Sequence, residues 1–351
     1  MTDAILKTEE RAILTLRALY RQYGYAPYKM SRFEEYDLYV RSKDFLLSDQ
    51  IITFSGDRGK LMALKPDVTL SIVKNAPEEP GVIQKVYYNE NVYRDYREIM
   101  QAGLECVGDL GAYEIAEVVL LAAKSLALLG ENYVLDISHM GLLNAVLNSC
   151  GFDEGEKKQT MTCIRRKSLH ELRTLCKDEN TWKKLQTLSA CHGTDMARVK
   201  AVLTTEEELQ AWEELNGLWS ILVGSGCGEH IRLDFSVGNN MRYYSGVVFR
   251  GYLEGIPSSV LSGGQYDKLP RRLGRNARAI GFAIYVDLLQ GEESRFDVDT
   301  LILHDGTVSP EVLTEAAARA AETGTVLVAR QKPDGRRWNR LIQYEKGEQV
   351  C

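Results

Sequence analysis

Gln101 and Glu105 are the polar residues whose spacing says most about chemistry. They fall in a segment of strand length, and alternate residues of a β-strand face opposite sides. A spacing of four therefore places the amide and the carboxylate on one face, where they are suited to binding a polar ligand. The alternative is an ordinary strand with a polar outward face. The residues alone leave both interpretations open.

Other polar residues also have two interpretations. Asp67 stands at the start of a predicted short helix, so it is either a helix cap or a binding carboxylate. Tyr243 and Tyr244 are neighbours, and in a strand one of them faces the core while the other faces a site. Tyr266 follows a Gly-Gly pair, which permits a close approach to a ligand or simply a turn.

Several kinds of catalytic chemistry lack their motifs. The seven cysteines contain no CxxC pair, and the one adjacent Cys/His pair, Cys191-His192, has no second pair to complete a zinc site. The five histidines are scattered, and no GxSxG, Walker or GxGxxG motif is present. We therefore predict reduced thiols, no metal and no cofactor.

The composition indicates a folded protein with a sizeable core. The 351 residues include 43 Lys+Arg and 49 Asp+Glu, a formal charge of −6, and 44% are hydrophobic. This acidic balance disfavours nonspecific nucleic-acid binding, so tRNA is an unlikely partner. No apolar run is long enough to span a membrane and the start lacks a signal-peptide layout, so we expect a cytoplasmic location and no membrane partner.

Strands and helices are expected in blocks rather than in strict alternation, which favours a largely antiparallel sheet covered by helices over a doubly wound fold. Hydrophobic periodicity, glycine and proline place the first elements. These are a helix at 9–23 ended by Gly24, a hairpin at 51–54 and 60–64, a short helix at 67–75 after Pro66, strands at 82–94 and 99–108, and a helix at 113–129.

The texture changes in the second half of the chain. Residues 153–225 are Lys/Glu-rich with almost no β-branched runs, which predicts a helical insertion. Sheet-like sequence resumes at Ile231. Beyond it we expect a small α/β segment, with a strand at 300–304, a helix at 310–322, a strand at 325–329, and a final dozen residues that fray.

Four runs, in this order, resemble the core of class II aminoacyl-tRNA synthetases, and among them the histidyl-tRNA synthetases. They are Leu64-Lys65-Pro66-Asp67-Val68-Thr69, then Val92-Tyr93-Arg94 with Arg97-Glu98 and 101–105, then 243–249, and finally 262–267 continuing into 281–289. The resemblance implies an α+β fold with a mostly antiparallel sheet flanked by helices. It also implies a core at 1–152 and 226–293, the insertion at 153–225 and a small C-terminal α/β segment at 294–351.

The departures from the synthetase pattern concern the groups that hold ATP. Arg94 survives, but Asn239 and Leu288 stand where the resemblance calls for arginine, and the loop after Arg94 is only two residues long. Losing even one well-placed charged contact lowers turnover by about 10²–10³-fold. We therefore expect no aminoacyl activation and no catalytic residues. Arg94 itself either binds phosphate or forms an ion pair with Asp95 or Glu98.

The positions that match the family's histidine pocket keep suitable polar side chains. Such a pocket must pair the ammonium of the ligand and offer the imidazole a fixed donor and acceptor. The resemblance assigns these roles to Asp67, Thr69, Gln101, Glu105, Tyr244 and Tyr266.

A synthetase-like core without activation chemistry resembles the regulatory subunits of ATP phosphoribosyltransferase. That resemblance implies a noncatalytic partner of the short-form catalytic subunit, needed for its activity and for feedback control by histidine in the first step of histidine biosynthesis. The segment 24–34 corresponds to motif 1, although Ser31 replaces its proline, and implies a homodimer within a hetero-oligomer. The shortness of 294–351 implies no platform for selecting tRNA.

Two other functions remain open on the sequence. One is a trimmed histidine-activating enzyme, which requires histidine-dependent ATP–pyrophosphate exchange. The other is a stand-alone histidine sensor or an RNA-binding relative, for which the charge gives no support. The sequence does not locate the surface that meets a catalytic subunit, nor does it decide whether inhibitory histidine binds the pocket or that interface.

Overall fold

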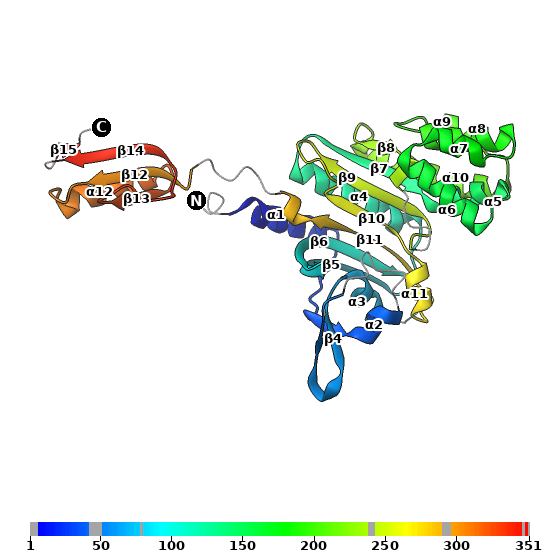
Figure 1. Ribbon diagram of the computed structural model, residues 1–351, viewed down its shortest axis with the longest axis horizontal. Helices are drawn as coiled ribbons and strands as arrows, with labels where there is room; N and C mark the ends of the chain where they lie inside the picture. Colours follow the sequence, from blue (N-terminus) through cyan, green and yellow to red (C-terminus); the bar gives the residue numbers. More distant parts are fainter. Residues whose placement is uncertain are drawn as a thin grey trace. The chain divides into compact units, whose positions relative to one another are not determined.

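The computed structural model describes residues 6–41, 51–77, 79, 81–237, 243–289, 296–345 and 348–349. The chain divides into two compact units, residues 1–289 and 290–351. Figure 1 shows the elements of each unit. Each unit is described by itself.

An eight-stranded sheet organises the first unit, and all but two of its strand pairs are antiparallel. The exceptions are the parallel pairs at the two edges, β1 with β5 and β7 with β8. In spatial order the strands are β1 (Ala26–Pro27), β5 (Ile83–Arg94), β6 (Arg97–Gly108), β11 (Arg278–Tyr285), β10 (Leu261–Gln265), β9 (Val247–Leu253), β7 (Tyr133–His139) and β8 (Ile231–Leu233). The mostly antiparallel sheet predicted from the sequence is confirmed.

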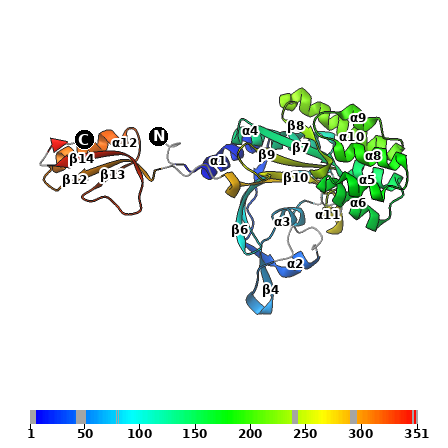
Figure 2. The same ribbon diagram turned by 45° about the horizontal axis from the view of Figure 1, so that its top comes forward.

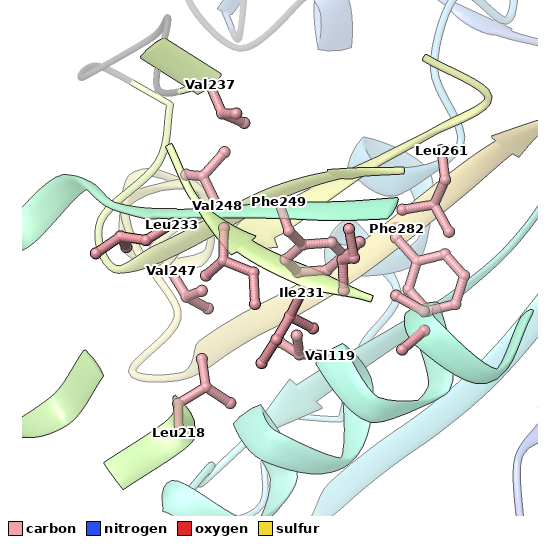
Figure 3. Close-up of a cluster of buried hydrophobic side chains, with 14 of the residues drawn as sticks. Val119, Leu218, Ile231, Leu233, Val237, Val247, Val248, Phe249, Leu261 and Phe282 are labelled. Carbon is pink, nitrogen blue, oxygen red and sulfur yellow. The ribbon is translucent and has the colours of Figure 1, made fainter. Parts of the chain in front are cut away.

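Helices α1 (Thr8–Gln22), α4 (Ala112–Leu129) and α5 (Met140–Ser149) bury one face of this sheet. Helix α4 forms where predicted, because its apolar residues recur at helical spacing and Glu114 accepts a hydrogen bond from the Gly111 amide at 2.8 Å. Figure 3 shows the core that results, with Val119 of α4 below Phe249 and Ile231 of the strands.

The other face carries a second, smaller core around the 67–75 region. Helix α3 (Thr69–Lys74), helix α2 (Tyr36–Arg41) and helix α11 (Lys268–Arg272) pack there. A three-stranded antiparallel sheet lies beside them, in the order β2 (Phe33–Glu35), β4 (Leu61–Leu64), β3 (Thr53–Ser55). The predicted hairpin is confirmed as the β3–β4 pair.

Five helices gather beside the β7–β8 end of the sheet, as both ribbon views show (Figures 1 and 2). They are α6 (Glu154–Arg166), α7 (Leu169–Leu175), α8 (Glu179–Ala190), α9 (Met196–Lys200) and α10 (Glu206–Leu222). Short helical turns complete the first unit at Asp57–Gly59, Val223–Cys227, Phe235–Val237 and Val286–Leu289. Of the described helices, none is long and apolar enough to cross a membrane.

The second unit is a four-stranded sheet with one helix. Its strand order is β13 (Val326–Ala329), β12 (Val298–His304), β14 (Trp338–Glu345), β15 (Glu348–Gln349), and α12 (Pro310–Ala321) packs on it. Of the last dozen residues, which were predicted to fray, 340–344 instead pair in parallel with β12 and 348–349 pair with β14. That pairing is a tertiary contact, and no local pattern in this polar segment indicates it. Residues 346, 347, 350 and 351 lie outside the described part of the chain.

Candidate functional site

The site residues come together at the centre of the large sheet, on the face opposite α4. Gln101 and Glu105 extend from β6, and both side chains are buried at 2% exposure. Thr69 and Asp67 approach from the start of α3, and Tyr266 from the residue after β10. All six predicted pocket residues, the other being Tyr244, line one cavity together with Arg94. The alternative of a strand face that is merely polar and exposed does not describe this geometry.

Glu105 is the centre of the hydrogen-bond network. Thr69 Oγ1 donates to Glu105 Oε1 at 2.6 Å, and the Tyr266 hydroxyl donates to Glu105 Oε2. Burial raises the pKa of Glu105 to about 8, against the lowering effect of these two hydrogen bonds, and the nearby Asp67 raises it further. A buried carboxylate with this pKa takes up a proton near neutral pH unless a cation pairs with it.

Asp67 caps helix α3 and also lines the cavity. Its Oδ1 accepts from the Leu70 amide at 2.8 Å, which caps α3, and its side chain lines the cavity. Burial raises the pKa of Asp67, while Arg94 lowers it. Arg94 Nη2 lies 3.8 Å from Asp67 Oδ2, and its Nε donates to the Pro66 carbonyl at 2.5 Å. The ion pair of Arg94 is therefore with Asp67, and the predicted partners Asp95 and Glu98 were wrong.

Two groups of the cavity have side chains without hydrogen bonds to any described residue. They are the amide of Gln101 and the hydroxyl of Tyr244. Both side chains line the cavity, so each is available to a ligand. An unpaired donor or acceptor beside the buried Glu105 and the largely buried Asp67 is the kind of arrangement that selects a polar, cationic ligand.

Sequence reasoning missed Tyr88, Ser262 and Tyr285, which also line the cavity. The Ser262 and Tyr285 hydroxyls are 3.0 Å apart and hydrogen-bonded. Tyr243 was expected to face the core if Tyr244 faced the site, but both line the cavity. The strand begins only at Val247, so residues 243 and 244 precede it in a turn and strand alternation does not apply to them.

Three aromatic rings make the cavity small. Tyr243 packs on Tyr244 with ring centroids 4.7 Å apart and on Tyr266 at 5.6 Å. The cavity volume is about 50 Å³. For comparison, an engineered cavity that binds benzene has a volume of about 150 Å³. A ligand as large as an amino acid therefore enters only when these side chains move.

Asn239 and Leu288 stand where the resemblance calls for arginine, and the structure describes only the second of them. Asn239 lies outside the described residues. Leu288 lies in the turn Val286–Leu289 after β11, is 38% exposed and does not line the cavity, whereas Tyr285 three residues earlier does. Among the described residues, Arg94 is the one cationic side chain in the lining, and it is already held by Asp67 and Pro66.

Gly281 on β11 leaves room for the Glu105 carboxylate. A Cβ placed on Gly281 would lie 1.7 Å from Glu105 Oε2 and 2.6 Å from the Leu104 carbonyl oxygen. No such contact is tolerated, so the close approach of β11 to β6 at this point requires glycine. Metal binding has no comparable support, since no group of three or more His, Cys, Asp or Glu side chains in the described segments is placed to hold an ion.

Gly281→Ala is expected to destabilise the protein by about 1–3 kcal/mol, because Glu105 and the strand must shift to admit the methyl group. Urea denaturation followed by circular dichroism measures this change. Gly217→Ala in helix α10 is the matched control. No atom lies within 4 Å of the added Cβ there, so this variant should gain up to about 1 kcal/mol from helix propensity. Equal effects of the two variants would contradict the packing argument.

The antiparallel sheet and its polar cavity define a core of the class II aminoacyl-tRNA synthetase type. A family model described as histidyl-tRNA synthetase matches residues 3–289, most of the chain. The chain therefore belongs to the histidyl-tRNA synthetase family.

Proteins similar in sequence to this chain are named as regulatory subunits. The chain is 29% identical over 282 residues to an ATP phosphoribosyltransferase regulatory subunit of Oceanobacillus iheyensis, covering 76% of this chain and 69% of the relative. It is 28% identical over 293 residues to the regulatory subunit of Clostridium kluyveri, covering 78% and 74%.

A solved structure supports the fold. It is described as an ATP phosphoribosyltransferase regulatory subunit/histidyl-tRNA synthetase from Bacillus halodurans, and it superposes with a TM-score of 0.76 at 24% identity. The match covers 96% of this chain and 94% of that one. At this identity the likeness establishes the fold.

Proposed function

We propose that this chain is the noncatalytic regulatory subunit of ATP phosphoribosyltransferase. In this role it is required for the activity of the short-form catalytic subunit and for feedback control by histidine, at the first step of histidine biosynthesis in the cytoplasm. Residues 1–152 with 226–293 form the core, 153–225 an insertion, and 294–351 a C-terminal segment. The core forms a homodimer within a hetero-oligomer with the catalytic subunit.

The proposal rests on one difference within the site: the half that would bind an amino acid keeps its polar groups, and the half that would hold a triphosphate does not keep all of its cations. The amino-acid half retains the buried carboxylate of Glu105, the largely buried carboxylate of Asp67, and the available Gln101 and Tyr244 side chains. The half that would hold a triphosphate offers Arg94 alone among the described residues, and Asp67 neutralises it at 3.8 Å. A site of this kind binds an amino acid and has little with which to stabilise charge moving on phosphates.

The ligand we assign to the cavity is L-histidine. Its ammonium and imidazole need acceptors and donors in fixed positions, and Asp67, Thr69, Gln101, Glu105, Tyr244 and Tyr266 supply them. The cavity of about 50 Å³ is too small for histidine as it stands. Binding is thereby coupled to a movement of the tyrosines, and a ligand that favours one conformation shifts the population toward it.

The direct test combines the chain with a short-form catalytic subunit. We expect the two to copurify, the phosphoribosyl transfer to require both, and L-histidine to inhibit the mixture. Calorimetric titration of the chain alone with millimolar L-histidine should give heat and a rise in melting temperature. Absence of copurification and of any effect on the catalytic subunit would overturn the regulatory role, whereas absence of heat alone would move the histidine site to the subunit interface.

One alternative within the same family is a trimmed enzyme that activates histidine. The retained polar cavity favours it, and the neutralised Arg94 opposes it. Histidine-dependent exchange of pyrophosphate into ATP separates the two functions. Exchange at a rate typical of a synthetase would replace our proposal. A stand-alone histidine sensor would instead bind histidine and leave every catalytic subunit unaffected.

A further inference from the structure

A second cleft lies on the other face of the large sheet. It has a volume of about 300 Å³ and is bounded by α4, α10 and the ends of β9, β10 and β11. Gln265 lines this cleft, while its neighbour Tyr266 lines the first cavity. Neighbouring residues of an extended chain face opposite sides, so the two sites lie back to back across the sheet. The volume is at the lower end of the range typical of small-molecule sites.

A fixed cation lines this cleft. Arg278 Nη1 donates to the Leu110 carbonyl at 2.7 Å, and its Nε lies 3.5 Å from Asp267 Oδ2. Asp267 is buried and also accepts from Gln265 Nε2 at 2.6 Å. The guanidinium is therefore held in place, while its Nη2 has no hydrogen bond to any described residue. An arginine positioned in this way is suited to binding a carboxylate.

The opposite wall of the cleft is acidic. Glu214 and Glu213 line it from α10, and His139 lines it from the end of β7. His139 Nδ1 accepts from the Leu142 amide at 3.1 Å, so the proton of the neutral ring is on Nε2, which faces Glu214 Oε2 at 3.5 Å. This hydrogen bond lowers the pKa of Glu214, and the charge of Arg278 lowers it further. Glu214 is thus a carboxylate within electrostatic reach of Arg278.

The remaining lining is apolar. Ile115 of α4, Leu218 and Ile221 of α10, and Val247 of β9 form it. Leu218 and Val247 are also part of the buried cluster drawn in Figure 3, so the cleft is continuous with the core. A cation, a carboxylate wall and an apolar surface within one small volume match a zwitterion that has an apolar substituent.

We propose that this second cleft binds a free L-α-amino acid with an apolar side chain. Its carboxylate pairs with Arg278, its ammonium with Glu214, and its side chain packs on Leu218, Ile221 and Val247. The proposal is independent of histidine binding in the first cavity, because the two sites share no side chain.

The test titrates the full chain calorimetrically with L-leucine, L-isoleucine, L-methionine and L-phenylalanine. We expect at least one of them to bind at one site per chain. Gly217 offers a way to block the cleft, since it lines the cleft and a Cβ there meets no atom within 4 Å. Gly217→Phe should weaken binding at least about ten-fold, while Gly217→Ala, which adds only a methyl group, should bind like the wild type.

Arg278→Gln and two ligand analogues test the charges separately. Losing a charge-assisted hydrogen bond should weaken L-leucine binding about ten-fold in Arg278→Gln. Leucinamide lacks the carboxylate and 4-methylpentanoate lacks the ammonium, so both should bind more weakly to the wild type. Glu105→Gln should leave L-leucine binding unchanged. The proposal fails if none of the four amino acids binds at millimolar concentration. It also fails if binding survives in Gly217→Phe, or if it is lost in Glu105→Gln, which would place it in the first cavity.

Discussion

Replacing Lys184 with methionine is expected to lower the free energy of unfolding by about 3–5 kcal/mol, because it leaves a buried carboxylate without its cation. Lys184 is 3% exposed and Glu208 is fully buried, and Lys184 Nζ lies 2.5 Å from Glu208 Oε1. Without the lysine, Glu208 stays desolvated and keeps only hydrogen bonds from neutral donors. Two-state urea denaturation of the full chain, followed at the far-ultraviolet helix signal, measures the loss.

The network around this pair explains the size of the effect. Lys184 Nζ also donates to Thr204 Oγ1 at 2.8 Å, and Glu208 Oε2 accepts from the Thr204 amide at 2.6 Å and the Thr205 amide at 3.1 Å. Burial alone would raise the pKa of Glu208, but Lys184, Ser149 and these amides lower it overall. A carboxyl whose folded pKa is depressed stabilises the protein at pH above the unfolded value, and that contribution is lost as the pH falls.

Two further variants show whether the pair itself is responsible. Lys183→Met changes the neighbouring, exposed lysine of the same helix and should alter stability by less than about 0.5 kcal/mol. The double variant Lys184→Met with Glu208→Met removes both charges and should recover most of the stability. If Lys184→Met were as stable as Lys183→Met, the pair would contribute nothing and the argument would be wrong.

Much of the fold could be predicted from the sequence because it rests on local periodicity. The strands β5 and β6 and the helix α4 contain their own signals in β-branched residues, apolar spacing and glycine ends. The strand β14 does not. Its residues 338–345 are mixed in polarity, and they form a strand only because β12 offers a free edge in parallel register. Such pairing depends on tertiary contacts that a local pattern does not contain.

The candidate site, like the fold, could be predicted from the sequence only in part. Six of its residues could be predicted, because the resemblance gave their roles and strand alternation places Gln101 and Glu105 on one face. In the structure all six line one cavity. The size of the cavity could not be predicted. It depends on the packing of Tyr243 against its two tyrosine neighbours and on the Ser262–Tyr285 hydrogen bond. These contacts join residues from separate elements whose rotamers are fixed only in the folded chain.

If the chain is the regulatory subunit we propose, histidine in this cavity must act on the catalytic partner without reacting. An enzyme uses binding energy to stabilise a transition state, whereas here that energy is available to change conformation. Tyr266 donates a hydrogen bond to Glu105 in the cavity, and it is followed directly by Asp267 and α11. A ligand that displaced Tyr266 would therefore move a residue that adjoins a helix outside the cavity. A ligand that only filled a preformed pocket would have no such effect.

Glu105→Gln is expected to change both the pH dependence of stability and the affinity for histidine. Burial raises the pKa of Glu105 from its ordinary value of 4.5 to about 8 in the folded chain. Between these values the folded chain keeps a proton that the unfolded chain has released, so wild-type stability falls as the pH rises from about 4.5 to 8. Glutamine does not titrate, so the variant should lose most of this slope. Burial also raises the pKa of Asp67, so the stability of the variant still falls with rising pH, but less steeply.

Melting temperatures across this pH range measure the slope, and calorimetry measures the affinity. Glu105→Gln should bind L-histidine about 10–100-fold more weakly, since a neutral amide replaces a carboxylate that pairs with a cationic ligand. Glu98→Gln is the matched control, because Glu98 is an exposed carboxylate on the same strand. It should keep both the slope and the affinity. An unchanged slope in Glu105→Gln would mean that the carboxyl is already ionised in the empty cavity. Unchanged affinity would mean that histidine binds elsewhere, since Glu105 lines the cavity.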